Sequence, residues 1–457
     1  MAVDPGIFKA YDVRGLYGEQ LDEALAYRIG RAYARVLGDL ESKPVEQLHV
    51  ALGRDMRLQA ADMAAAYREG ILDEGASVTD VGMVGTEMLY FAVGSKELDG
   101  GLMCTASHNP KAYTGAKLVR RGALALSGDA GIGEIRDMVM AGEPGAPEGT
   151  RGTLMEEDVA EGFRAAAMSF IDPGLISPIS VVLDGGNGMA GQMVGPLLDQ
   201  LPITQSPSYW TPDGEFPDHE PNPLLPENRT FIIKKVLSEG AELGIAWDGD
   251  ADRCFFIDDT GQFVDGDFLT ALLGQAILLR EPGATILYDV RASRAVRDTV
   301  EAGGGTATVN RVGHAFFKSR MREEGAAFGG EVSGHYYFRD FYCADSGTLP
   351  ALLVLEMLSR KGQRLSELLA RYRDNYFISG EINSEVADTD AKMQEIAERY
   401  SDGQVTWLDG VSVDYDDWHF NVRPSNTEPL LRLNLESLAS EDDMAAKRDQ
   451  VLDLIRA

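Results

Sequence analysis

The chain has 457 residues and a formal net charge of -31, from 42 Lys plus Arg against 73 Asp plus Glu. At about 100 to 200 residues per domain, its length predicts three or four domains, and its ordinary hydrophobic content excludes wholesale disorder. The acidity argues against a nucleic-acid partner, because proteins that bind the phosphate backbone need a cationic surface.

Short apolar runs that end in a polar turn alternate with amphipathic stretches along the chain. Apolar residues at three- and four-residue spacing predict helices, and each short apolar run predicts a buried strand. This alternation indicates α/β layers, in which ligands bind beyond the carboxyl ends of the strands. In chain order, the sequence predicts the helix Leu21–Leu37, the strand His49–Asp55, the helix Gln59–Glu74, and the strands Ser180–Gly188, Leu243–Asp248 and Thr285–Val290.

Changes in composition divide the chain. The segment Gly142–Gly152 is rich in Gly and Pro, which predicts that a first domain ends near residue 150. Seven of the 19 prolines lie between Pro202 and Pro226, and this stretch is expected to be a loop that cannot enter a sheet. Residues Glu381–Asp417 hold eleven acidic residues and only two basic ones, which indicates the solvated face of a smaller C-terminal domain that begins near residue 371.

The first candidate site is the segment Thr105–Pro110, which follows an apolar strand. Small neighbours leave the hydroxyl of Ser107 accessible, and His108 and Asn109 offer donors beside it. A polar turn with a helix cap is the alternative interpretation. A triad hydrolase is disfavoured, because the Gly-x-Ser-x-Gly elbow is absent from this segment.

The second candidate is the acidic loop that follows the strand Ile245–Trp247. Asp248, Asp250 and Asp252 would repel one another by about 4 kcal/mol per close pair at an effective dielectric of about 20, so a convergent arrangement implies a cation. All-oxygen ligation indicates Mg²⁺ rather than zinc. A calcium EF-hand is disfavoured, because Arg253 stands where that loop needs Gly. Splayed surface carboxylates are the alternative.

Two further loops suit sugar-phosphate recognition. Gly330–His335 presents Glu331, Ser333 and His335 between glycines, a set that fits hydroxyl recognition. Arg423–Pro429 combines an Arg with three short hydrogen-bonding side chains between two prolines, which fits a loop that closes on a phosphate. Ordinary turns are the alternative at both places.

The sequence offers no membrane or export signal. Met1–Gly15 contains charged residues and no apolar core, so it does not form a secretory signal. The most apolar run, Leu269–Leu279, is far shorter than the roughly 18 residues of a membrane span and predicts a buried helix. Cys104, Cys254 and Cys343 are far apart, which indicates a reducing compartment without disulfides or structural zinc. We expect a cytoplasmic protein without a membrane partner, either a monomer or a weak homo-oligomer.

Together these segments resemble the α-D-phosphohexomutase superfamily, in particular its phosphomannomutase/phosphoglucomutase members. The match runs from Phe8–Gly15 to Arg423–Pro429, and the serine, metal, sugar and phosphate loops occur in the family's order. The resemblance implies three similar mixed-sheet α/β domains and a smaller α+β C-terminal domain around a central cleft. The implied domains are residues 1–150 with the phosphoserine loop, 151–257 with the metal loop, 258–370 with the sugar-recognition loop and 371–457 with the phosphate-binding loop.

The resemblance further implies a phosphohexomutase that interconverts the 1-phosphate and 6-phosphate of a hexose, mannose and/or glucose. Ser107 would carry a phosphoryl group and pass it to the sugar phosphate, so that hexose 1,6-bisphosphate is the intermediate and activator. Mg²⁺ would neutralise charge on the transferred group. The implied residues are Arg14, Ser107, His108, Lys117 and His335 for catalysis; Ser107, Asp248, Asp250 and Asp252 for the metal; and Arg253, Arg291, His314, Glu331, Ser333, Arg423, Ser425, Asn426 and Thr427 for the substrate.

Arg291 departs from the family pattern, because relatives often carry Lys there and the two side chains are not interchangeable.

One alternative function is a Mg²⁺-dependent sugar phosphatase with Asp248 as nucleophile. Asp252 disfavours it, because such phosphatases carry Thr or Val at its position. Another is a non-catalytic sugar-phosphate sensor. In so acidic a protein, the basic side chains are expected to form a cationic interior for a doubly phosphorylated intermediate: Arg14, Lys117, Arg253, Arg291, His314 and Arg423.

Overall fold

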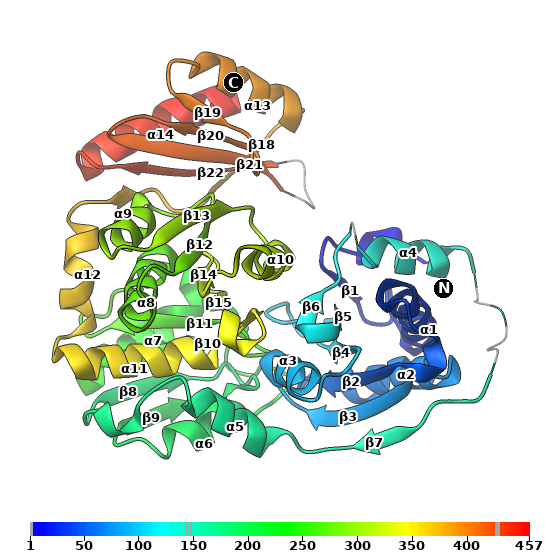
Figure 1. Ribbon diagram of the computed structural model, residues 1–457. Helices are drawn as coiled ribbons and strands as arrows, with labels where there is room; N and C mark the ends of the chain where they lie inside the picture. Colours follow the sequence, from blue (N-terminus) through cyan, green and yellow to red (C-terminus); the bar gives the residue numbers. More distant parts are fainter. Residues whose placement is uncertain (1–2, 129, 143–144, 146–148, 426–429) are drawn as a thin grey trace. The chain divides into compact units, whose positions relative to one another are not determined.

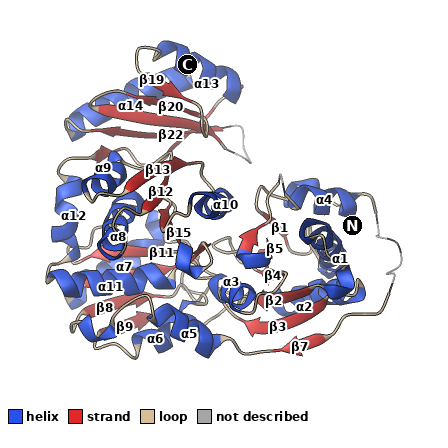
Figure 2. Ribbon diagram, in the orientation of Figure 1, coloured by secondary structure: helices blue, strands red, loops and turns tan. Residues whose placement is uncertain are grey.

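The computed structural model describes residues 3–128, 130–142, 145, 149–425 and 430–457 (Figure 1). The chain divides into two compact units. The first comprises Met1–Val264 and Gly334–Arg364, and the second comprises Asp265–Ser333 and Leu365–Ala457. Helices and strands alternate through most of the chain (Figure 2). Across the described residues, no helix combines the length and the apolar character needed to cross a membrane.

The first unit begins with a seven-stranded mixed sheet. Its strands lie in the order β1 (Asp12–Leu16), β5 (Tyr113–Arg120), β4 (Gly100–Cys104), β2 (His49–Arg54), β3 (Ser77–Met83) and β7 (Leu154–Glu156), with β6 (Leu124–Ala125) paired to β5. β2 runs parallel to β3 and β4, whereas β5 pairs antiparallel with β4 and β1. The strand predicted at His49 is therefore confirmed as a central strand of this sheet.

Four helices pack against this sheet. They are α1 (Glu23–Glu41), α2 (Ala60–Asp73), α3 (Thr86–Ser95) and α4 (Ile132–Met140). One core joins α1, α2 and α4 to the sheet, with Ile29, Tyr67 and Ile135 packed against strand residues such as Val50. Asp22 caps α1 by accepting a hydrogen bond from the backbone N–H of Leu25 at 2.8 Å.

A four-stranded sheet follows in the same unit. Its order is β11 (Cys254–Asp258), β10 (Leu243–Trp247), β8 (Ser180–Asp184) and β9 (Thr204–Ser208). The expectation that the segment between Pro202 and Pro226 cannot enter a sheet is wrong, because β9 contains Pro207 and pairs in parallel with β8. β9 is an edge strand, where a residue without an N–H is tolerated. The unit also contains α5 (Ala160–Met168), α6 (Ala190–Leu198), α7 (Pro226–Glu239), β15 (Tyr336–Phe338), β16 (Ala344–Asp345) and α11 (Thr348–Lys361).

The second unit contains a parallel group of strands and a separate antiparallel sheet. β12 (Thr285–Asp289) pairs in parallel with β13 (Thr306–Asn310) and β14 (Phe328–Gly330), together with helices α8 (Gly266–Arg280), α9 (Arg294–Ala302), α10 (His314–Glu324) and α12 (Leu365–Arg373). The antiparallel sheet has the order β17 (Phe377–Ile378), β22 (Leu430–Ser437), β21 (Trp418–Pro424), β20 (Val411–Asp414) and β19 (Gln404–Thr406), with β18 (Ile382–Glu385) paired to β22. Helices α13 (Thr389–Arg399) and α14 (Glu441–Arg456) share one core with it.

The predicted fold class, mixed α/β sheets followed by a smaller α+β region, is confirmed. The predicted buried helix lies within α8, although its last residue, Leu279, is 76% exposed. The predicted domain limits near residues 257 and 370 fall inside β11 and α12, and the limit near 150 precedes β7, which belongs to the first sheet. The division into four domains at those positions stays a prediction.

Candidate active site

Ser107 lies in the buried first part of the loop that joins β4 to β5. Its side chain is in the core of the first unit, with the residue only 4% exposed. The hydroxyl donates to Oδ2 of Asp248 at 2.9 Å and lies 3.2 Å from Nδ1 of His108. The φ angle of Ser107 is 48°, in the left-handed region that side chains with a Cβ seldom adopt. Backbone strain of this kind is concentrated at functional positions.

The side chain of Arg57 holds this loop in place. Its Nη2 donates to the carbonyl oxygens of Ser107 at 2.8 Å and Asn109 at 2.6 Å, and its Nη1 donates to the carbonyl of Pro110 at 3.0 Å. The Arg57 side chain is 1% exposed. Sequence reasoning missed Arg57, although charged residues directly after the predicted strand at His49 were a signal that this strand end serves a site.

The three aspartates of the acidic loop converge. Asp248, Asp250 and Asp252 are fully buried, and each offers a carboxylate oxygen within 4.8 Å of the other two. Within the described part of the chain, Oδ1 of Asp250 and Oδ1 of Asp252 are buried without a hydrogen-bond partner. Buried carboxylate oxygens that lack donors fit a divalent cation with oxygen ligands, which supports the predicted Mg²⁺ site.

Two cations balance these carboxylates. Nζ of Lys117, from β5, lies 2.7 Å from Oδ2 of Asp250 and also contacts Asp252. Nε and Nη2 of Arg253 donate to Oδ2 of Asp248 at 2.9 and 2.8 Å. Burial opposes the charged form of Asp250, but Lys117 outweighs it and holds the pKa of Asp250 below its usual range. Burial, and then the charge of Asp250, raise the pKa of Asp252 well above its usual value.

The acidic loop packs directly on the serine loop and on α3. A Cβ at Gly249 would lie 2.5 Å from the carbonyl oxygen of Ser107, so only Gly permits this approach. At the start of α3, the backbone N–H of Thr86 donates to the carbonyl of Asp250 at 3.1 Å, and the Thr86 hydroxyl donates to the Asp250 carboxylate. Thr86 was not predicted as a site residue, because its partner is distant in the sequence.

His108 and Arg14 complete the group around Ser107. Burial, and then the charges of Arg253 and Arg14, hold the pKa of His108 well below its ordinary value, so the imidazole is neutral near pH 7. Arg14 contacts the amide oxygen of Asn109 and pairs with the carboxylate of Asp12. The structure thus brings both predicted residues to the serine loop.

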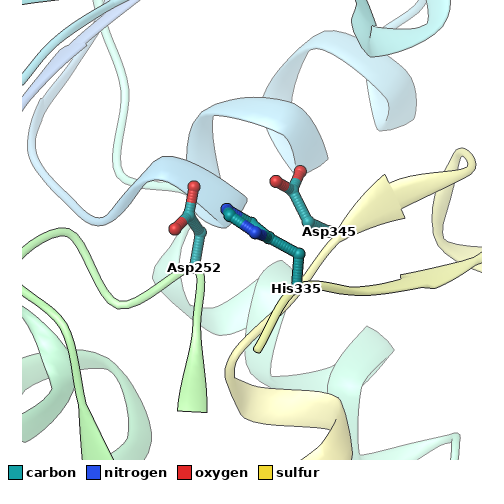
Figure 3. A group of neighbouring side chains, drawn as sticks. All are labelled: Asp252, His335 and Asp345. Atoms are coloured by element: carbon teal, nitrogen blue, oxygen red, sulfur yellow. The ribbon is translucent and has the colours of Figure 1, made fainter. Parts of the chain in front are cut away.

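His335 lies beside the acidic loop, between two carboxylates. One ring nitrogen of His335 and one oxygen each of Asp252 and Asp345 lie within 4.8 Å of one another. Figure 3 shows the imidazole placed between the two carboxylates, with Asp345 projecting from β16. An imidazole held between two carboxylates is a candidate for exchanging protons with a bound substrate. Asp345, which is 1% exposed, was not predicted.

In the second unit, the predicted sugar-recognition residues surround Arg291. Nε and Nη2 of Arg291 donate to the carboxylate of Asp289 at 3.0 and 2.8 Å, and Nη2 lies 3.7 Å from Oε2 of Glu331. The hydroxyl of Ser333 donates to Oε2 of Glu331 at 3.5 Å. The backbone N–H of Gly313, just before the predicted residue His314, donates to the same carboxylate at 3.2 Å.

In the second unit, the predicted phosphate-binding residue Arg423 is hydrogen-bonded to Glu381, which was not predicted as a site residue. Nη2 of Arg423 donates to Oε2 of Glu381 at 2.8 Å, and Nη1 of Arg432 donates to Oε1 at 3.1 Å. Nη2 of Arg432 also donates to the hydroxyl of Ser425 at 3.3 Å. The other predicted residues of this loop, Asn426 and Thr427, lie outside the described residues.

Comparison with known proteins finds matches along most of the chain. It matches the phosphoglucomutase/phosphomannomutase families for alpha/beta/alpha domain I over residues 5–144, domain II over 165–261, domain III over 265–376, and the C-terminal domain over 381–454. The phosphomannomutase of Salmonella montevideo is 41% identical, over 98% of this chain and 99% of the relative. The phosphohexose mutases protein of Xanthomonas campestris is 42% identical over the same shares. A phosphoglucomutase/phosphomannomutase family protein of Burkholderia thailandensis has a similar structure, with a TM-score of 0.89, 32% identity, and coverage of 99% of this chain and 97% of that one. The chain therefore belongs to the phosphoglucomutase/phosphomannomutase family.

Proposed function

We propose that this protein is a phosphohexomutase that interconverts hexose 1-phosphate and hexose 6-phosphate, with mannose and/or glucose as the sugar. The observation that carries the proposal is the buried hydroxyl of Ser107, 2.9 Å from the first of three convergent aspartates, in a chain of this family. Ser107 carries a phosphoryl group between turnovers. It passes that group to the sugar phosphate, and hexose 1,6-bisphosphate returns its other phosphate to Ser107.

The transfer breaks the bond between phosphorus and Oγ of Ser107 and forms a bond between phosphorus and the sugar oxygen. Nη2 of Arg253 lies 3.3 Å from Oγ of Ser107, so it stabilises negative charge as the serine oxygen leaves. Arg57 fixes the loop through the carbonyl of Ser107, which keeps the phosphorylated oxygen in one place. Position and electrostatics supply most of the acceleration in such transfers.

The attacking sugar hydroxyl must lose a proton. We assign its acceptance to His335, because its imidazole lies between the carboxylates of Asp252 and Asp345. The proton returns to the leaving sugar oxygen in the second transfer, so the protein ends each cycle unchanged. His108 is neutral and is assigned to hydrogen bonding with the serine-linked group. Lys117 and Arg14 provide positive charge at the same place.

Asp248, Asp250 and Asp252, together with the phosphoryl oxygen on Ser107, are the residues that would hold Mg²⁺. The bound ion would neutralise charge on the transferred group. In the second unit, Glu331 and Ser333 would accept and donate hydrogen bonds to sugar hydroxyls. Arg291, His314 and the loop that runs from Arg423 through Ser425, Asn426 and Thr427 would bind the phosphate that is not reacting. A cytoplasmic location remains a prediction from the sequence.

One experiment separates the mutase from its alternatives. The purified protein is incubated with glucose 1-phosphate or mannose 1-phosphate, and the sugar phosphates, free phosphate and the phosphorylation of Ser107 are measured by mass spectrometry. The mutase forms the 6-phosphate isomer, with a phosphoryl group on Ser107 that is lost to excess sugar phosphate. Free phosphate without isomer indicates a phosphatase, and binding without either product indicates a sensor; both outcomes reject the proposal.

Ser107→Ala should abolish turnover while retaining sugar-phosphate binding, because it removes the only atom that carries the phosphoryl group. Ser169→Ala, at an exposed serine after α5, is the matched control and should keep wild-type turnover. Wild-type turnover in Ser107→Ala would refute the assignment of the nucleophile. Ratios of kcat/KM for mannose 1-phosphate and glucose 1-phosphate then establish which sugar is preferred.

A further inference from the structure

Three guanidinium groups of the second unit converge on the carboxylate of Glu381. Arg423 and Arg432 donate to it at 2.8 and 3.1 Å, and Nη1 of Arg291 lies 3.7 Å from Oε2. The Arg423 and Arg291 side chains are only 8% and 7% exposed, whereas Glu381 is 28% exposed. The Arg432 side chain is 29% exposed, so the carboxylate lies with Arg432 on the solvent-accessible side of two buried guanidinium groups.

The strand register explains why a counterion is needed at this place. Arg423 on β21 and Arg432 on β22 are directly opposite each other in the antiparallel ladder. Like charges opposite one another destabilise a sheet unless an acid separates them. Glu381, which immediately precedes β18 beside β22, supplies that acid. Arg291 is already paired with Asp289, so Glu381 mainly serves the two cross-strand arginines.

The charges of the group support this arrangement. Burial alone would raise the pKa of Glu381, but Arg291, Arg423 and Arg432 outweigh it and hold that pKa below its usual range. Burial, and then Arg291, lower the pKa of Arg423, which reflects crowding of positive charge. Within the described residues, Nε of Arg423 and Nε of Arg432 are buried without a hydrogen-bond partner. The arginines thus keep donors that Glu381 does not use.

We propose that Glu381 is an internal counterion that a phosphate group must displace from Arg423 and Arg432. This inference rests on the proposed function, in which the loop after Arg423 binds the phosphate that is not reacting. Without phosphate, Glu381 keeps the two guanidinium groups together and aligned. When phosphate binds, its two negative charges replace the single charge of Glu381 on the same donors.

Such competition has a use in a mutase. The two phosphates of a hexose 1,6-bisphosphate must occupy the non-reacting position in turn, so this position has to release a phosphate in every cycle. Binding that is equally strong in the ground state and the transition state lowers KM without raising kcat. Glu381 sets phosphate affinity low enough for release.

The test measures inorganic phosphate binding to the full-length protein by calorimetry at pH 7.5 in EDTA. Glu381→Gln removes the competing charge at nearly constant size, and its Kd for phosphate should fall about tenfold. Arg423→Gln should lose this binding, which identifies the site that is being titrated. Glu385→Gln, at an exposed position on the strand β18 that follows Glu381, is the control and should bind as the wild type does.

Glu381→Asp separates charge from packing, because it keeps the carboxylate with a shorter side chain. It should bind phosphate less tightly than Glu381→Gln, and circular dichroism establishes that each variant is folded. Equal tightening in Glu381→Asp and Glu381→Gln, or unchanged or weaker binding in Glu381→Gln, overturns the proposal. If the protein is a mutase, KM for the sugar phosphate should also fall in Glu381→Gln without a rise in kcat. Phosphate binding is measured without turnover, so a failure here is distinct from an absence of isomerase activity.

Discussion

Lys117 is the cation that neutralises Asp250 and Asp252 when no metal is bound. Its side chain is 8% exposed, the two carboxylates are fully buried, and Nζ lies 2.7 Å from Oδ2 of Asp250. Removing one partner of a buried ion pair costs about 3 to 5 kcal/mol, because the other charge stays buried without compensation. Lys117→Met keeps most of the side-chain volume, so its free energy of unfolding in EDTA should fall by about that amount.

Magnesium should reverse much of this loss. A divalent ion brings more positive charge to the same carboxylates than the ammonium removed, and it no longer competes with Lys117 for their oxygens. A ligand at 100 times its Kd stabilises the folded state by about 2.7 kcal/mol, and tighter binding adds to this. The wild type gains stability from Mg²⁺ too, so at saturation the deficit shrinks by RT ln of the ratio of the two Kd values. Binding about 30-fold tighter in Lys117→Met should make the deficit about 2 kcal/mol smaller than in EDTA.

Urea unfolding with and without Mg²⁺ measures both quantities. Trp247 directly precedes Asp248 and donates from Nε1 to the carbonyl of Gly347 at 3.0 Å, so one of the four tryptophans that contribute to the fluorescence lies in this region. Lys111→Met is the control, since Lys111 pairs with Glu215 at the surface, where the two side chains are 58% and 53% exposed, and no measurable loss is expected. Equal losses in EDTA and in Mg²⁺, or a loss in EDTA no larger than that of the control, would refute the reasoning.

Two buried acids should give the protein a measurable pH dependence. Burial raises the pKa of Glu87 to about 8 from 4.5, although the hydroxyls of Ser346 and Thr348 donate to its carboxylate. The folded state therefore keeps a proton that the unfolded state loses. The free energy of unfolding of the wild type, relative to that of Glu87→Gln, should decline between pH 4.5 and pH 8 by up to about 1.4 kcal/mol per pH unit. Parallel pH profiles of the two proteins in urea unfolding would contradict this. Burial likewise raises the pKa of Glu436, 3.6 Å from His419, to about 7 from 4.5, so wild type should lose stability relative to Glu436→Gln between those pH values. A constant difference between the two proteins across that range would show that Glu436 is ionised in the folded state.

The parts of this protein that sequence could predict are those set by short-range patterns. The apolar runs at His49, Ser180, Leu243 and Thr285 predicted β2, β8, β10 and β12, because a buried strand needs only a few consecutive apolar residues. The acidic loop was equally predictable, since three carboxylates within five residues require a cation wherever they converge. In each case the physical cause of the predicted feature lies in residues that are close together in the sequence.

The residues that were missed depend on contacts between distant segments. The hydroxyl of Thr86 reaches Asp250 across 164 residues, and the hydroxyl of Ser346 reaches Glu87 across 259. No local pattern encodes such a pairing. A weaker signal did exist for Glu87, because it is the only charged residue in the otherwise apolar or small helix α3, and a buried acid there needs donors from elsewhere.

The structure also corrects the prediction of a positively charged interior. The sequence predicted a cationic interior, but the structure pairs five of the predicted cations with carboxylates. The pairs are Arg14 with Asp12, Lys117 with two aspartates of the acidic loop, Arg253 with Asp248, Arg291 with Asp289, and Arg423 with Glu381. Burying each unpaired cation would cost several kcal/mol, which is comparable to the whole free energy of unfolding of a folded protein. The acids that give the chain its net charge of -31 thus also neutralise its interior. On the proposed function, phosphate and metal would bind by exchange, since each would displace a charge that the protein itself supplies. The affinity of each site would then be set by the difference in interaction free energy between the incoming ion and the side chain that it replaces. Substitutions that remove the competing charge, such as Glu381→Gln at the phosphate site and Lys117→Met at the metal site, should therefore tighten binding.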